Sequence, residues 1–361
     1  MLLSGGARDM KRVLLSLAWL ITAAVVLFTA YAGYVLLSYR RIPDNQMLGV
    51  SGSAAGTLET GAAYALVSWN VGFGAYSSDY SFFMDGGEHA RALSKDAVLE
   101  NTAAAARRLQ ALDPDFALLQ EADWDSDRSY HVDQRALFKS ALPNRASAYA
   151  VNYDSPYLFY PLHEPIGRSR SGVLTLSRWR IDGAVRRSLP VEEGFSKFLD
   201  LDRCYSVSRV PVGNGRELCL YNLHLSAYTT DGLIAAAQLR MLLDDMAEEI
   251  QNGNYAIAAG DFNKDLLGDS SKIFGVSGAQ YTWAQPFPVE LLPEGIALHA
   301  PQGAPSCRNT DAAYAPGGTF VLTIDGFLAS ENVEALSAEV LDEGFSHSDH
   351  NPVRLSFRLL P

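Results

Sequence analysis

The chain ends with a segment in which three side chains can bind a metal ion or transfer a proton. The segment is GFSHSDHNPVRLSF (344–357), and it places His347, Asp349 and His350 within four positions. A carboxylate binds hard divalent cations, and an imidazole changes its protonation near neutral pH. Because Asp349 and His350 precede an alternating apolar run, we expect them to lie at the start of a strand that fixes their position. We interpret His347 as a loop histidine outside the site.

Polar groups of the same kinds end other apolar runs of the chain. A buried carboxylate or amide needs a partner, and one divalent cation with the oxygens of a phosphate group can serve several of them. Strand ends at one edge of a sheet bring such side chains together. We therefore predict one site that contains Asn70, Glu121, Asn222, His224, Asp261, Asn263, Asp325, Asp349 and His350.

Taken singly, these residues also have explanations that involve no chemistry. The alternatives are a turn for Asn70, a solvated acidic loop for Glu121, an Asx turn or helix cap for Asp261 and Asn263, a β-turn for Asp325, and a core position for His224. Their joint occurrence at the ends of apolar runs favours a common site.

Short apolar runs alternate with longer helical segments from Tyr64 onward, which predicts an α/β domain. Helices are expected over 96–112 and 231–250, where apolar residues recur at three- and four-residue steps. The predicted strands are 64–72, 116–122, 171–178, 204–212, 217–225, 255–263, 319–330 and 350–359.

The N-terminal segment from Val13 to Tyr39 carries no charge. As a helix it would be about 40 Å long, more than the ~30 Å hydrocarbon core of a bilayer. The small-x-small sequence AYA (30–32) leaves a cleaved signal peptide as the alternative, but the apolar run continues past it. We therefore expect one N-terminal transmembrane helix.

These patterns divide the chain into a membrane anchor (1–41), a flexible linker (42–63) rich in Gly, Ser, Ala and Thr, and a catalytic domain (64–361). Basic residues flank both ends of the apolar run and favour a cytoplasmic N-terminus only slightly. We expect a single-pass cell-membrane protein with an extracytoplasmic domain, or a secreted protein if the leader is cleaved.

Bulk composition narrows the class of protein. The 361 residues include 41 acidic and 29 basic side chains, a net charge of −12, which disfavours nucleic acid as a partner. The three cysteines have no CxxC spacing, which argues against a thiolate zinc site. Cys204 and Cys219 flank a turn at GNG (213–215), so a disulfide between them stays open.

Seven motifs follow one another along the chain. They are SWNV (68–71), LLQE (118–121), SGVLTLSR (171–178), NLHL (222–225), AAGDFN (258–263), TIDGFLAS (323–330) and SDHNPV (348–353). In this order they resemble the endonuclease/exonuclease/phosphatase superfamily, which includes DNase I-like nucleases, neutral sphingomyelinases and inositol polyphosphate 5-phosphatases. The resemblance implies a four-layer α-β-β-α sandwich, with two mixed sheets packed face to face and helices outside.

The resemblance implies hydrolysis of a phosphate ester with Mg²⁺ as cofactor, Mn²⁺ being a substitute. Glu121 looks like the main metal ligand, with Asn70 and Asp349 close by. Asp261 would orient or deprotonate the attacking water, and Asn263 would hold a phosphate oxygen.

The same resemblance assigns the histidines to the phosphate. His350 would contact the scissile group, with Asp325 fixing its tautomer and raising its pKa. His224 looks like a second phosphate-facing histidine, and Asn222 would support that site. The general base and the number of metal ions stay open.

The substrate is expected to be a phospholipid head group or another small phosphodiester. Arg128, Arg168 and Arg170 are the candidate phosphate-binding cations in the loops between motifs, which are otherwise aromatic and mostly acidic or neutral. The alternatives are a secreted or surface nuclease, an inositol or sugar phosphatase, and a binding module without catalysis. No protein partner is inferred.

Overall fold

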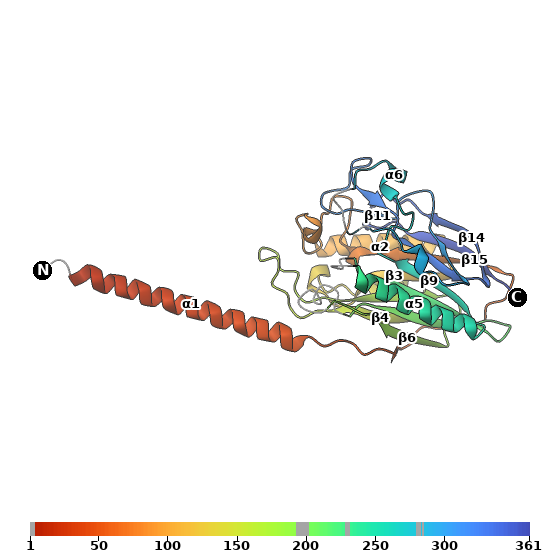
Figure 1. The fold of residues 1–361 in the computed structure, drawn as a ribbon, viewed down its shortest axis with the longest axis horizontal. Coiled ribbons are helices and arrows are strands. Elements are labelled where there is room, and N and C mark those ends of the chain that lie inside the picture. The colour runs from red at the N-terminus through yellow and green to blue at the C-terminus, as the bar shows by residue number, and fades with distance from the viewer. Residues whose placement is uncertain (1–3, 193–201, 228–231, 279–282, 284) are drawn as a thin grey trace.

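A computed structural model of the chain describes residues 4–192, 202–227, 232–278, 283 and 285–361. Figure 1 shows a long N-terminal helix that extends away from a sandwich of two β-sheets with helices outside. The C-terminus lies at the end of the domain that is remote from this helix (Figure 1).

One sheet has seven strands, and its parallel pair, β8 and β9, lies among antiparallel neighbours. Its strands, in spatial order, are β1 (Gln46–Met47), β6 (Gly183–Ser188), β7 (Cys204–Pro211), β8 (Glu217–His224), β9 (Tyr255–Asp261), β13 (Asp325–Ser330) and β10 (Ile296–His299).

The other sheet has six strands and is also mixed, with β2 parallel to β3. Its strands, in spatial order, are β14 (Val333–Val340), β15 (Val353–Leu359), β2 (Ala63–Asn70), β3 (Phe116–Asp123), β5 (Arg170–Ser177) and β4 (Ala146–Asp154). A separate two-stranded sheet joins β11 (Cys307–Arg308) to β12 (Val321–Leu322).

The helices cover the outer faces of the two large sheets, so the predicted four-layer sandwich is confirmed. The long helix α5 packs on the seven-stranded sheet, and α2 packs on the six-stranded sheet. The helices are α1 (Ser4–Ser38), α2 (Lys95–Leu112), α3 (Gln134–Ala141), α5 (Leu233–Gln251) and α6 (Ser270–Phe274), with 3-10 turns η1 (Gly72–Gly74), η2 (Phe83–Asp85), η3 (Asp127–Ser129) and η4 (Val289–Leu291).

Helix α2 illustrates why the sequence folds as the apolar spacing predicts. The Ser94 side chain accepts a hydrogen bond from the Ala97 amide (3.1 Å), which caps the first turn. The helix ends at Asp113, whose φ of 41° is left-handed, and Pro114 follows.

The main core lies between the two sheets. Alternate side chains of β2, β3 and β15 face those of β8, β9 and β13, so apolar groups from both sheets interdigitate. Leu118, Ile257 and Phe357 are among the fully buried members. This packing fixes how the strand ends of one sheet lie relative to those of the other.

Residues 42–63, expected to be a flexible linker, lie instead against the domain. Strand β1 pairs with β6, and Ser51 forms a β-bridge with Ser147. Leu58 is fully buried in the core between the sheets. The segment therefore runs along the domain with Leu58 as its buried contact, although most of its small residues are exposed.

Two further expectations need correction. The run 319–330 is not one strand, because it is interrupted between β12 and β13. The Ser306 hydroxyl accepts the amide N–H groups of Ile324 (3.0 Å) and Asp325 (3.1 Å) at the break. The predicted strand 350–359 begins only at Val353, after Pro352. Strands β1, β4, β6, β10, β11 and β14 were not predicted.

The three cysteines are free and buried, so the disulfide left open by the sequence does not form. The predicted hairpin at 213–215 does join β7 to β8, but Cys219 lies opposite Arg209. Cys204 is five positions along that strand, roughly 16 Å away, which is too far for an S–S bond.

By length and composition, α1 is able to cross a membrane over Asp9–Ser38. The side chains of this segment are almost all exposed, including Trp19 and Leu37. An apolar surface of this size on a helix that packs so little against the domain needs an apolar environment or a partner.

We expect Leu58→Ala to lower the free energy of unfolding by about 2–5 kcal/mol, because it leaves a cavity between the sheets. Urea denaturation of the full-length protein in detergent, followed by tryptophan fluorescence, measures this. Met47→Ala, in the same segment but with a side chain 73% exposed, is the matched control. Equal stabilities of the two variants would contradict the placement of this segment on the domain.

Candidate active site

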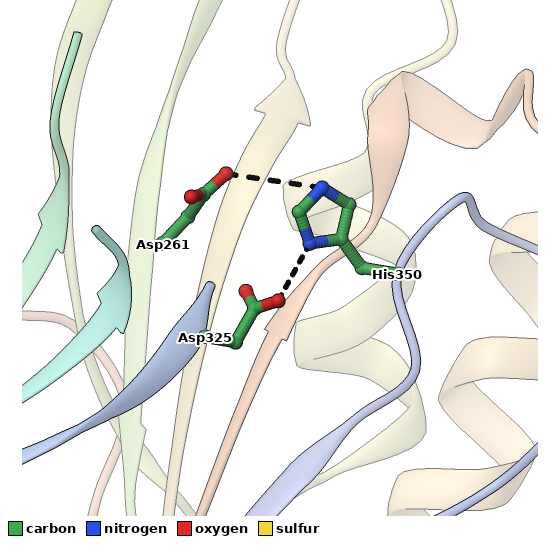
Figure 2. Close-up of side chains that lie close together, drawn as sticks. All are labelled: Asp261, Asp325 and His350. Carbon is green, nitrogen blue, oxygen red and sulfur yellow. Dashed lines mark hydrogen bonds and ion pairs between the residues drawn. The ribbon is translucent and has the colours of Figure 1, made fainter. Parts of the chain in front are cut away.

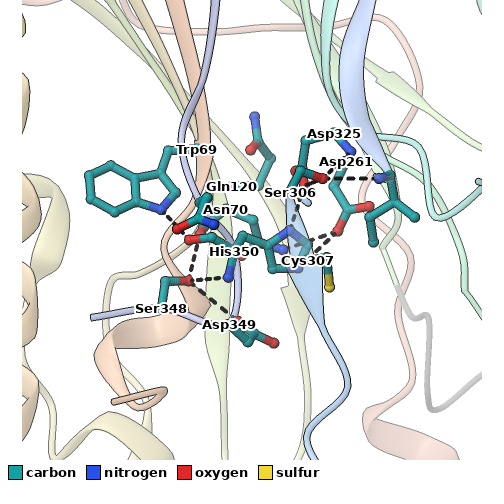
Figure 3. Close-up of polar contacts among 12 residues, drawn as sticks. Trp69, Asn70, Gln120, Asp261, Ser306, Cys307, Asp325, Ser348, Asp349 and His350 are labelled. Carbon is teal, nitrogen blue, oxygen red and sulfur yellow. Dashed lines mark hydrogen bonds and ion pairs between the residues drawn. The ribbon is translucent and has the colours of Figure 1, made fainter. Parts of the chain in front are cut away.

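A pocket lies where strand ends of the two large sheets meet. The structure brings most of the predicted site residues to this place, although they come from positions 70 to 350 of the chain. The predicted residues that line it are Asn70, Glu121, Arg128, His224, Asp261, Asn263, Asp349 and His350. Figure 3 shows part of this cluster.

Asn70, at the end of β2, connects acidic groups from different sheets. Its amide nitrogen donates to Glu121 Oε1 (3.3 Å) and to Asp261 Oδ2 (3.1 Å). Its side-chain oxygen Oδ1 accepts a hydrogen bond from the Gly72 backbone amide (3.0 Å), which fixes the orientation of the side chain. One side chain thus holds β3 and β9 together at their ends.

Glu121 reaches the pocket because the backbone of β3 is irregular there. The pairing of β3 with β5 shifts register between Leu119 and Ala122, and Glu121 has a φ of 54°. A β-bulge of this kind turns a side chain away from its regular direction. The Glu121 side chain is 25% exposed, so it faces the pocket while its neighbours in the strand stay buried.

Asp349 occupies the same side of the pocket as Glu121. Burial raises its pKa to about 6, with Glu121 adding to the rise and His350 opposing it. A Cβ atom at Gly72 would lie 2.9 Å from Asp349 Oδ1, and the φ of Gly72 is +49°. Glycine is therefore required where the chain leaves β2.

The carboxylates of Glu121 and Asp349 fit a hard divalent cation, whereas Asn70 turns its amide nitrogen to Glu121 and its Oδ1 to the Gly72 amide. Both offer carboxylate oxygens, which Mg²⁺ and Mn²⁺ prefer, and the charge of Glu121 adds to the cost of ionising the buried Asp349. A bound cation would offset that cost. When bound, it would neutralise charge on a phosphate oxygen and lower the pKa of a coordinated water.

A second cluster that could hold a metal consists of Asp261, Asp325 and His350, whose nearest ligand atoms lie within 4.8 Å of one another. The His350 Nδ1 is already 2.7 Å from Asp325 Oδ2 (Figure 2), and Asp261 Oδ1 already accepts the Asn263 amide. We therefore interpret this cluster as a hydrogen-bonded acid–base network, and the prediction of a cation at Glu121 remains a prediction.

Asp325 fixes the orientation of the His350 ring through a hydrogen bond to Nδ1. Its Oδ2 atom also accepts the Ser306 hydroxyl (2.7 Å), so both the carboxylate and the imidazole are fixed. Burial acts to lower the pKa of His350, but the charges of Asp325 and Asp349 raise it well above its usual value. The imidazole is therefore held as a cation whose Nε2 points toward Asp261 (Figure 2).

The backbone of His350 is fixed by two further bonds. The Trp69 indole donates to its carbonyl oxygen (2.8 Å), and its amide donates to the Ser348 hydroxyl (3.2 Å). Ser348 in turn donates to the Asn70 carbonyl (2.7 Å). The start of β15 and the end of β2 are thereby joined at the pocket, as Figure 3 shows.

Asp261 lies between two imidazoles. Its Oδ2 is 3.5 Å from His224 Nε2 and 3.8 Å from His350 Nε2. Burial raises the pKa of Asp261 to about 7, although His350 opposes the rise. Burial lowers the pKa of His224 well below its usual value, with Arg203 and His350 adding to the effect. The two histidines therefore differ in charge, with His224 neutral.

Asn263 directs its amide group at the same place through a left-handed backbone (φ 50°). Its side-chain nitrogen donates to the Leu225 carbonyl (2.8 Å), and its backbone amide donates to Asp261 Oδ1 (2.9 Å). The turn after β9 thus orients Asn263 and Asp261 together.

Among the three predicted arginines, only Arg128 lines the pocket. It donates to both oxygens of Asp123 (3.1 and 2.9 Å) and lies over the Phe73 ring. One of its nitrogens is 4.0 Å from Glu121 Oε2. The guanidinium is therefore held rigidly beside the expected cation site.

Arg168 and Arg170 lie outside this pocket and both pair with Asp154. Arg170 also lies over the Trp124 ring. Their loops follow β4 and begin β5, and the paired carboxylate draws both side chains away from the site. The expectation that they bind phosphate is not supported by their placement.

Asn222 likewise does not line the pocket. It is fully buried between the sheets, where it accepts a hydrogen bond from Gln120 (2.8 Å) and donates to Thr175 (3.3 Å). Successive side chains of a strand point to opposite faces of the sheet, and the Asn222 side chain points toward the other sheet. Asn222 is therefore placed below the site and not against a substrate.

Several lining residues were not predicted from the sequence. Arg308 is almost fully buried and donates to the carbonyls of Ser77 (3.0 Å) and Tyr80 (3.2 Å). Its amide donates to the Asp349 carbonyl (2.9 Å). Arg203, Asn152, Tyr76 and Cys307 also line the pocket. The sequence around these residues contains no motif that would have predicted their place in the pocket.

We expect Glu121→Gln to weaken binding of Mg²⁺ or Mn²⁺ by at least about tenfold, because it removes a charged oxygen donor from the cation site. Isothermal titration of the full-length protein in detergent measures the affinity. Glu294→Gln, at an exposed position outside the pocket, is the matched control. Unchanged affinity in Glu121→Gln would place the cation elsewhere.

Comparisons with known proteins agree with this architecture. No match was found among curated proteins. A solved endonuclease/exonuclease/phosphatase from Beutenbergia cavernae DSM 12333 is 17% identical, covering 82% of this chain and 72% of that chain, with a TM-score of 0.58. A family protein from Leptotrichia buccalis C-1013-b is 12% identical, covering 82% and 100%, with a TM-score of 0.54.

A structure of D. rerio TDP2, complexed with single strand DNA product, is 16% identical, covering 82% of this chain and 99% of that chain, with a TM-score of 0.51. At these identities the likeness shows the fold. The model of the Endonuclease/Exonuclease/phosphatase family matches residues 67–350, which is most of the chain. This protein therefore belongs to the Endonuclease/Exonuclease/phosphatase family and is a metal-dependent phosphoester hydrolase.

Proposed function

We propose that this protein is a membrane-tethered, Mg²⁺-dependent phosphodiesterase that hydrolyses a phospholipid head group or another small phosphodiester. One observation carries the choice of substrate: the connection between α1 and the domain is very short. Helix α1 ends at Ser38, and the Arg41 guanidinium already donates to the Leu189 carbonyl (2.8 Å). If α1 spans a bilayer, the domain is held at its surface.

The surroundings of the pocket support a small substrate over a nucleic acid. The cations that line it, Arg128, Arg203 and Arg308, are buried or partly buried, and the net charge of the chain is −12. A nucleic acid requires an extended basic surface that tracks its backbone. The recessed cations suit one phosphodiester group that enters the pocket.

In this proposal, the side chains around Asp261 activate water. Asn70 holds the Asp261 carboxylate at the centre of the pocket, and Asn263 fixes its other oxygen. Asp261 orients the attacking water and accepts its proton. The raised pKa of this buried carboxyl suits proton transfer near neutral pH.

The histidines act on the phosphate. His350, held as a cation by Asp325, donates a hydrogen bond from Nε2 to a non-bridging oxygen, where charge develops during attack. Neutral His224 lies on the other side of Asp261 and donates a hydrogen bond from Nε2 to the same phosphate group. Asn263 contributes its amide to a further phosphate oxygen. The cation at Glu121 would supply the remaining charge stabilisation.

We expect His350→Ala to lower kcat on a soluble nitrophenyl phosphodiester by about 10²–10⁴-fold, with Mg²⁺ affinity nearly unchanged. His347→Ala is the matched control, because it lies three positions away and bonds to Asn101 instead of the pocket network. Steady-state kinetics and metal titration separate the two effects. If both alanine variants kept wild-type turnover, the proposed role of His350 would be wrong.

We also expect the full-length protein, reconstituted in vesicles of zwitterionic and anionic phospholipids, to release soluble phosphorylated head groups with Mg²⁺. Chelation should abolish the release, because no cation would then be present at Glu121 to stabilise the charge that develops on the phosphate. Head groups are measured by phosphate analysis after phosphatase treatment. Degradation of plasmid or single-stranded DNA without head-group release would favour the nuclease alternative.

A further inference from the structure

The segment between β4 and β5 carries an unusual set of exposed apolar side chains. We call residues 157–162, with the sequence YLFYPL, the aromatic loop. Phe159 is 53% exposed, Tyr160 69% and Leu162 84%. Large apolar side chains grouped at one exposed tip mark a surface that binds a membrane or another apolar partner.

The aromatic loop lies against the end of α1 that is nearest the domain. The Tyr31 hydroxyl donates to the Tyr157 carbonyl (3.1 Å) and accepts the Phe159 amide (3.0 Å). The Tyr34 hydroxyl accepts the Tyr157 amide (3.2 Å). The rings of Tyr31 and Phe159 also meet edge to face, 5.3 Å apart. Helix and loop therefore share one position along the axis of α1.

The length of α1 gives the depth of that position in a bilayer. The uncharged run begins at Val13, and about 20 helical residues cross the ~30 Å hydrocarbon core. The span then ends near Tyr31 and Tyr34, which is where tyrosine rings prefer to lie, at the boundary with water. Because Phe159 packs on Tyr31, it lies at the same boundary.

The composition of the loop suits this environment. From Tyr157 to Leu162 it carries no charged side chain, so insertion buries no charge. Its ends are closed by a β-bridge between Leu158 and Gly167, and the Ile166 amide donates to the Tyr160 carbonyl (3.1 Å). Several backbone groups of the loop, which would be costly to leave unpaired in an apolar medium, are thus paired.

The aromatic loop is also joined to the pocket. Ile166, at its base, lines the pocket. The Tyr160 ring contacts the Phe83 ring in η2 (5.7 Å), and Met84 and Asp85 of the same turn line the pocket. Glu164 fixes the base by accepting the Ala90 amide (2.6 Å). The aromatic loop therefore lies next to the pocket and contacts the turn that lines it.

We propose that the aromatic loop inserts Phe159, Tyr160 and Leu162 into the interface of the bilayer that α1 spans, as a second membrane contact. Two contacts prevent the domain from turning about the end of α1, and they hold the pocket mouth against the lipid head groups. The insertion rests on α1 being a membrane span, and its effect on catalysis rests on the proposed function.

Site-specific labelling of the full-length protein in vesicles tests the insertion. Leu162→Cys carries an environment-sensitive fluorophore, and selective labelling is feasible because Cys204, Cys219 and Cys307 are buried. Leu336→Cys, 42% exposed on β14, is the matched control. We expect a blue-shifted emission at position 162 that is quenched by brominated phospholipids, and neither effect at position 336.

Two results would overturn the proposal. A label at position 162 that emits as in water and escapes quenching shows that the loop lies outside the bilayer. A blue-shifted label that brominated lipids do not quench shows instead that a second copy or another protein covers the loop. Both results leave the chemistry of the pocket unaffected.

Kinetics of the double variant Phe159→Ser with Leu162→Ser test the effect on catalysis. Neither residue lines the pocket, so turnover of a soluble nitrophenyl phosphodiester should be unchanged. Head-group release from vesicles should fall by about tenfold, because the apolar contact with the interface is lost. Equal release by variant and wild type would overturn the role of the loop in catalysis.

The two assays separate failure of this inference from failure of the proposed function. If wild-type protein releases no head groups while the label at position 162 is quenched, the insertion stands and the lipid substrate is wrong. If head groups are released while the label is not quenched, the substrate stands and the insertion is wrong.

Discussion

The site depends on the cost of placing several carboxyl groups in one buried pocket. Glu121, Asp261 and Asp349 come from different segments of the chain and line the same pocket. Burial raises the pKa values of Asp261 and Asp349, which measures how unfavourable their ionisation is there. The Asn70 amide offsets part of this cost by donating to Glu121 and Asp261. A divalent cation with a phosphate group is suited to offset the rest.

Backbone irregularities at the strand ends aim these groups at each other. Glu121 at the bulge of β3, Asn263 after β9 and Gly72 after β2 all have left-handed φ values. Such conformations cost energy in residues other than glycine, so the surrounding sheets must hold them in place. The tightly packed core between the sheets, together with the bonds from Trp69 and Ser348 to His350, supplies that rigidity.

The N-terminal part of the chain is more closely tied to the domain than a tether requires. Residues 42–63 pack on the sheets, and the last turns of α1 bond to the aromatic loop. The consequence is a defined direction of the pocket relative to α1. Under the proposed function, this direction governs how the pocket is presented to the head groups of the bilayer.

The sequence by itself determined the fold class, the order of the strands that carry polar ends, and eight of the residues that line the pocket. Apolar periodicity placed α2, α5 and the central strands, and β2, β8 and β9 end in the site residues Asn70, His224 and Asp261. The family resemblance of the motifs then agreed with the family match of residues 67–350.

Only the tertiary structure decided which side chains meet. The sequence did not show that Asn222 turns into the core, that Arg168 and Arg170 are drawn to Asp154, or that Arg308 lies behind Asp349. It also did not show that residues 42–63 pack on the domain or that Tyr31 bonds to the aromatic loop. The physical reason is the same in each case: composition and spacing fix what a segment can do locally, whereas pairing across a sheet, bulges and contacts between distant segments depend on the packing of the whole chain.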